Sequence, residues 1–94
     1  MSNSEFIVED IFELTTRKVV VVTGNILDGE VSSSMFLLSD DSELRVKINT
    51  VENLNSGNAS IGLIFQPKNE TDTRKLMGIK PGEVLIFSMH SSIA

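Results

Sequence analysis

The chain has no cysteine, tryptophan or tyrosine, and it has two prolines and one histidine among its 94 residues. Without cysteine, a disulfide scaffold, a thiolate nucleophile and a Cys-ligated metal are excluded, so the core must hold the fold alone. Five Phe residues supply all the aromatic bulk. No window reaches the ~20 apolar residues of a membrane-spanning helix, and the first residues lack a signal-peptide pattern. We therefore expect a cytoplasmic protein.

Cationic residues are also scarce, because 13 Asp and Glu stand against 8 Lys and Arg, which gives a net charge of −5. Nucleic-acid binders usually need a positive surface to displace counterions, so this balance disfavours DNA binding. The charge is uneven, with nine acids and two bases in residues 1–43 and four acids and six bases in residues 44–94. If the halves separate in space, this predicts an acidic side and a mildly basic side.

Strand patterns dominate what is present. Apolar residues alternate with basic ones or occur in short β-branched runs, both of which are typical of strands. Glu9 and Asp10 interrupt the first such pattern, which indicates a bulge or bend there. The predicted strands cover residues 6–8 with 11–12, 19–23, 44–48, 61–65 and 84–87.

Turn signals separate these strands. Asp28-Gly29, between Ile26-Leu27 and Glu30-Val31, predicts a tight hairpin. Lys80-Pro81-Gly82-Glu83 predicts a type II turn, because Pro fixes φ and Gly accepts a positive φ. Asp72 is the predicted cap of one helical turn that runs through Leu76 and Met77. Further polar turns are predicted at residues 39–42 and 53–58.

Short strands with tight turns and little helix predict an all-β fold, a small closed antiparallel β-barrel of six to seven strands. Closure would satisfy the edge groups that an open sheet exposes. We expect a single domain over residues 1–94, with an ordered core of about residues 5–88 and a flexible tail at 89–94.

Five segments in order resemble the second domain of translational GTPases, the β-barrel that follows the nucleotide-binding domain in elongation factor Tu. They are residues 6–12, 20–31, 46–52, 59–65 and 78–85. The resemblance implies an elongation factor Tu domain 2-like fold, the translation protein barrel, and a translation-related role. The chain has no Gly-x-x-x-x-Gly-Lys-Ser/Thr loop to wrap phosphates, so it is no GTPase by that route.

No catalytic constellation is visible in the sequence. His90, the one histidine, lies after the last predicted strand without a nucleophile or an orienting partner. Glu9 and Asp10 are strand neighbours and point to opposite faces. The acids Asp40, Asp41 and Glu43 lack the regular oxygen spacing of a calcium loop. We expect no enzymatic activity, no cofactor and no metal.

Basic residues form the candidate partner surface. Arg45 and Lys47 share one face of a predicted strand, and Arg74 and Lys75 add a second pair. If these residues converge, they would contact phosphates or an acidic protein face. The leading hypothesis is a protein–protein interaction module or a self-associating one. The alternative is an RNA- or tRNA-contacting accessory protein of translation. We expect no membrane and no DNA partner.

Overall fold

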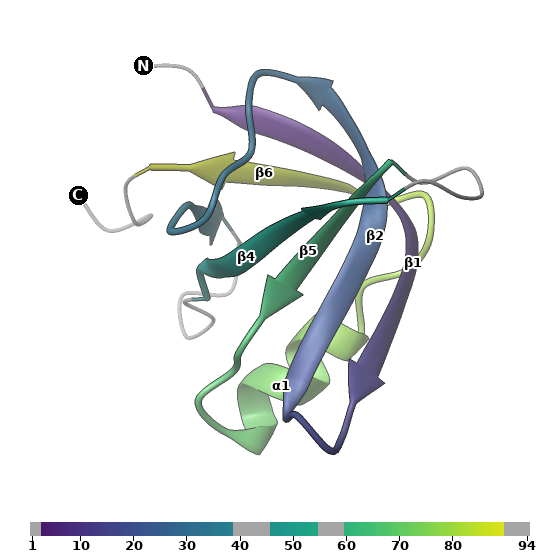
Figure 1. Ribbon diagram of the computed structural model, residues 1–94, viewed down its shortest axis with the longest axis vertical. Coiled ribbons are helices and arrows are strands. Elements are labelled where there is room, and N and C mark those ends of the chain that lie inside the picture. The colour runs from purple at the N-terminus through teal and green to yellow at the C-terminus, as the bar shows by residue number, and fades with distance from the viewer. Residues whose placement is uncertain (1–2, 39–45, 55–59, 90–94) are drawn as a thin grey trace.

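A computed structural model describes residues 3–38, 46–54 and 60–89. Within these residues the chain forms six β-strands and one α-helix (Figure 1). The elements are β1 (Ser4–Leu14), β2 (Val19–Asp28), β3 (Phe36–Leu38), β4 (Ile48–Asn53), β5 (Ile61–Phe65), α1 (Glu70–Met77) and β6 (Val84–Ser88). The all-β class and the strands predicted at 6–12, 19–23, 61–65 and 84–87 are confirmed. The strand predicted at 44–48 instead begins at Ile48, and its first residues, with the tail at 90–94, lie outside the described ranges.

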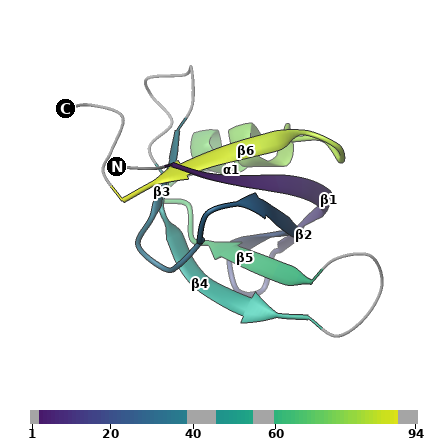
Figure 2. The same cartoon turned by 90° about the horizontal axis from the view of Figure 1, so that it is seen from above.

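The six strands form one antiparallel sheet in the order β3-β6-β1-β2-β5-β4. The sheet curls strongly into a half-barrel (Figure 2), so the prediction of a closed barrel is wrong. One isolated bridge joins Phe36 of β3 to Lys47, the residue before β4. Next to the bridge, Leu37 N donates to Val46 O at 3.0 Å and Ile48 N donates to Met35 O at 2.8 Å. We call this junction the seam. β3 is three residues long, and within the described residues it forms a ladder with β6 but not with β4.

The predicted irregularity at Glu9 and Asp10 is confirmed. Val8 pairs with Gly24 and Asp10 pairs with Thr23, which leaves Glu9 as the extra residue of a bulge. Gly24 is required here because a Cβ atom at this position would lie 1.9 Å from the Ile7 carbonyl oxygen. The missing side chain therefore lets β1 bend against β2.

The type II turn at residues 80–83 is also confirmed. Gly82 has φ +92°, and Glu83 N donates to Lys80 O at 3.1 Å. The turn packs on the bulged strand, because Gly82 N donates to Val8 O at 2.7 Å and Val8 N donates to Glu83 O at 2.9 Å. These bonds attach the bend of β1 to the start of β6.

The hairpin predicted at Asp28-Gly29 is wrong in its pairing. Gly29 does take a positive φ of +75°, so the chain turns there. However, residues 30–35 form no strand, and β3 pairs with β6 rather than with β2. Val31 and Met35 are buried in the core, and Ser4 Oγ donates to the Glu30 carbonyl. These contacts position residues 30–35 so that β3 forms at the edge of the sheet, beside β6.

The helix cap is likewise displaced from its predicted position. Asn69 is the N-cap, and its Oδ1 accepts from Asp72 N at 2.9 Å, so α1 begins three residues earlier than expected. An Asn side chain satisfies a terminal N–H as well as Asp does. α1 lies beside the ends of β1 and β2 (Figure 1) and inserts the fully buried Leu76 into the core.

Three phenylalanines build the centre of the core. Phe6, Phe65 and Phe87 are fully buried. The rings of Phe65 and Phe87 stack at 6.2 Å between centroids, and Phe6 meets Phe87 edge-on at 6.4 Å. Such pairs add to the free energy of burial, and they replace the missing Trp and Tyr. The surrounding side chains are aliphatic and come from all six strands and α1.

Substituting Ala for Gly24 should destabilise the fold strongly. The added methyl group would collide with the backbone of β1, so the free energy of unfolding should fall by about 2 to 4 kcal/mol. Gly78→Ala is the matched control, because Gly78 has φ −78° and its nearest contact would be at 3.4 Å. Urea unfolding followed by circular dichroism measures both. Equal stability of the two variants would contradict the close approach at Gly24.

Candidate binding surfaces

The predicted basic residues occupy separate surfaces. Lys47 is exposed at the seam, and Arg74 and Lys75 lie on α1. Arg74 Nη2 lies 3.9 Å from Glu70 Oε2, and both side chains face solvent at 83 % and 92 % exposure, so this ion pair contributes little to stability. Lys75 lines a hollow that also contains Glu83. Arg45 lies outside the described residues, as do Asp40, Asp41, Glu43 and His90.

The hollow that contains Lys47 lies beside the seam. We call it the seam hollow, and its volume is about 260 Å³. Phe36 and Lys47 are bridge partners on neighbouring strand edges, so their side chains share one face. The remaining lining comes from β4, from the segment after β5 and from α1. The full lining is Phe36, Val46, Lys47, Asn49, Gln66, Lys68 and Asp72.

The seam hollow carries an excess of positive charge. It contains two ammonium groups, Lys47 and Lys68, against the carboxylate of Asp72. Lys68 also lines a second hollow, with Lys18, Glu13 and Glu70, and a third hollow holds Lys75 with Glu83. Within residues 3–38, 46–54 and 60–89, no carboxylate lies within 4 Å of the Lys47 or Lys68 ammonium group. The seam hollow is therefore suited to an anion although the chain as a whole is acidic.

A second feature lies on the convex side of the sheet. Phe12 pairs with Val21, and Val21 pairs with Ile64, so these three side chains form a row across β1, β2 and β5. The adjacent row, Ile11, Val22 and Leu63, faces the core, so the Phe12 row faces outward. Leu14 and Val19 extend it by one further pair. We call Phe12, Leu14, Val19, Val21 and Ile64 the outer patch.

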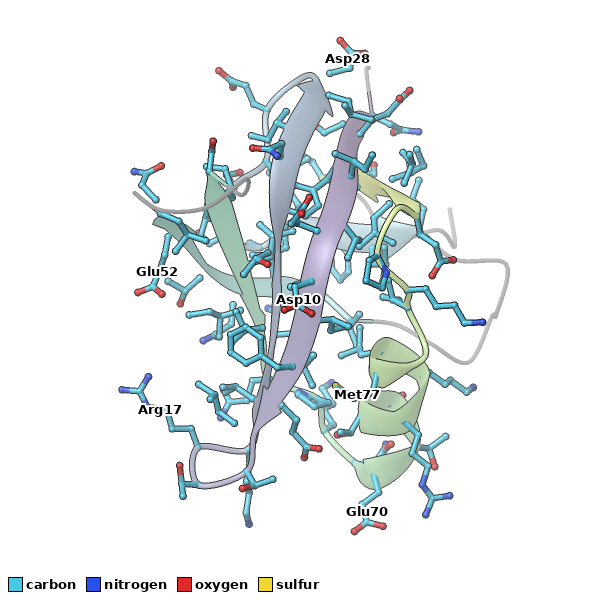
Figure 3. The ribbon with its side chains drawn as sticks, turned by 90° about the vertical axis from the view of Figure 1, so that its right-hand side faces the viewer. Asp10, Arg17, Asp28, Glu52, Glu70 and Met77 are labelled. Atoms are coloured by element: carbon cyan, nitrogen blue, oxygen red, sulfur yellow. The ribbon has the colours of Figure 1, made fainter. Side chains whose placement is uncertain are left out.

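The outer patch is apolar at its centre and acidic beside it. Phe12 is 39 % exposed, whereas Val21 is largely covered between its two neighbours. The next row on the same face runs from Asp10 through Thr23 and Gly62 to Glu52. Asp10 lies on β1 and Glu52 on β4, and both are exposed (Figure 3). In the sheet, β2 and β5 lie between these two strands.

Another exposed apolar side chain on the sheet has no comparable surroundings. Val84 on β6 is 45 % exposed and pairs with Ile7, but the next residue in that row is the polar Asn25. The outer patch is thus the longer apolar row of the two. Sequence reasoning missed it, although the alternation of Phe12 and Leu14 with Ile11 and Glu13 carried the signal.

The remaining chemistry of the described part is sparse. No helix among the described residues is long and apolar enough to cross a membrane. In the same residues, no three histidine or carboxylate side chains gather as metal ligands would.

The chain has no significant match among protein-family models, curated proteins or solved structures. The resemblance to the second domain of translational GTPases therefore rests on the order of the sequence segments alone.

Proposed function

We propose that the chain is a non-catalytic protein-binding module and that the outer patch is its contact surface. One observation carries the proposal, namely the outward row of Phe12, Val21 and Ile64 across three strands. Phe12 is partly exposed at the end of this apolar row, and exposed aromatic side chains beside apolar neighbours are enriched at protein–protein contact sites. A partially exposed Phe that becomes buried on binding is a strong candidate for a hot spot.

The acidic neighbours define the chemistry of the partner. Asp10 and Glu52 flank the apolar row on the same face, and the whole chain carries a net charge of −5. Such a surface favours a partner segment with apolar side chains flanked by Lys or Arg, because complementary charge raises the association rate and selects the partner. Two copies of this acidic chain repel each other, so we place a different protein before self-association.

The alternative, contact with RNA, receives less support. Lys47 and Lys75 line different hollows, and Arg74 pairs with Glu70 in solvent. Single-stranded RNA needs a continuous cationic track that follows its backbone. The curled all-β sheet is compatible with kinship to the second domain of translational GTPases, and we include that kinship, and a place in translation, in the proposal.

Replacing Phe12 with Thr should abolish partner capture without unfolding the protein. Thr keeps the strand propensity but removes the apolar anchor, so affinity should fall about tenfold or more. The measurement is a pull-down by the tagged protein from nuclease-treated lysate at moderate salt, with partners identified by mass spectrometry. Val84→Thr is the matched control, because Val84 is equally exposed on another part of the sheet. Equal loss in both variants, or in neither, would contradict the assignment.

Removing the flanking charges should slow association. In the double variant Asp10→Asn and Glu52→Gln, we expect the association rate for the captured partner to fall about two- to fivefold at low salt and to depend less on salt. Asp28→Asn is the control, since Asp28 lies at the far end of β2 (Figure 3). Surface plasmon resonance at several salt concentrations gives the rates. If the double variant has an unchanged salt dependence, the partner is not selected by these two acids.

A further inference from the structure

The seam hollow combines lysines, a phenylalanine and side-chain amides, and the protein contact proposed for the outer patch involves none of these residues. We propose that it binds a small aromatic phosphate, in chemical class a nucleoside monophosphate. This ligand is separate from the protein partner proposed above, and the site shares no residue with the outer patch.

The phosphate would lie against Lys47 and Lys68. These two ammonium groups come from segments on either side of β5 and line the same hollow. Among the described residues neither lies within 4 Å of a carboxylate, so their charge is not already neutralised. An ammonium group offers three donors, and phosphate oxygens accept charge-assisted bonds from it. Two such groups in one hollow favour an anion with several oxygens.

The aromatic ring would lie against Phe36. This side chain is half-buried, and it sits directly across the seam bridge from Lys47. A ring attached to a phosphate on Lys47 therefore reaches the Phe36 ring within one strand spacing. The carboxamides of Asn49 and Gln66 line the same hollow and offer both donors and acceptors to a heterocycle edge. This combination of cation, ring and amide selects against a plain inorganic anion.

Backbone hydrogen bonds fix one wall of the hollow, at Phe36 and Lys47. The bonds from Leu37 N to Val46 O at 3.0 Å and from Ile48 N to Met35 O at 2.8 Å lie on the two sides of the Phe36–Lys47 bridge. They hold the backbone at Phe36 and Lys47 in register, so this part of the backbone needs no rearrangement on binding. A volume of about 260 Å³ is close to the size of a mononucleotide.

The test is a ¹⁵N–¹H NMR titration with AMP at low salt, in parallel with adenosine, inorganic phosphate and a single-stranded oligo(A). We expect saturable shifts with AMP at the amides of Phe36, Lys47, Asn49 and Lys68. The double variant Lys47→Gln and Lys68→Gln should weaken AMP about tenfold or more. Lys80→Gln, an exposed lysine away from the hollow, is the matched control and should leave AMP binding unchanged.

A variant expected to bind AMP more tightly is a test that misfolding of the protein cannot mimic. Asp72 is the one carboxylate among the residues that line the hollow, so Asp72→Asn should tighten AMP about two- to fivefold. Asp28→Asn removes an exposed carboxylate at the end of β2, away from the hollow, and should change nothing. Unchanged or weaker binding by Asp72→Asn would overturn the proposal.

The other ligands separate the competing explanations. Inorganic phosphate binding as tightly as AMP would mean an adventitious ion only, and it would overturn the aromatic class. Oligo(A) binding without AMP binding would replace the proposal with an RNA site. Absence of shifts at the hollow would also overturn it. Phe12→Thr should retain AMP binding, so failure of the outer patch and failure of the seam hollow are distinguishable.

Discussion

The close approach of β1 to Gly24 is the constraint on which the rest of the sheet depends. A side chain at this position would overlap the Ile7 carbonyl, so the bulge at Glu9 can form only beside a glycine. The bulge divides β1 into two parts. Residues 5–7 pair with both β2 and β6, whereas residues 10–14 pair with β2. The turn at residues 80–83 bonds to Val8 at the division and so starts β6 at the correct place.

This division also explains where the two candidate surfaces lie. The second part of β1 is not covered by β6, and its outward Phe12 therefore remains partly exposed beside Val21. The curl that follows from the bend brings the edges β3 and β4 together at the seam, where Phe36 meets Lys47. We thus relate both surfaces to the bend of β1: the outer patch with its acidic neighbours, and the cationic seam hollow. Their opposite charge character suits them to different ligands.

Local features of the fold could be predicted from the sequence, and long-range ones could not. The β-branched run at residues 19–22, the Pro81-Gly82 turn and the break at Glu9 are each set by neighbouring residues. The route after Gly29 depends on the burial of Val31 and Met35 in a core that the local pattern does not reveal. The seam hollow could not be predicted for the same reason, because Phe36, Lys47 and the pair Lys68 and Asp72 come from three separate parts of the chain. Arg74 and Lys75 are neighbours, but adjacent helix positions do not face the same way.

The most direct test of the central claim is an NMR cross-saturation measurement on the ¹⁵N,²H-labelled chain bound to its captured protein partner. If the outer patch is the contact surface, saturation should transfer to the amides of Phe12, Val21 and Ile64. Little saturation should then reach the amides of Phe36 and Lys47. Transfer confined to the seam residues would contradict the claim and would move the protein contact to the other surface.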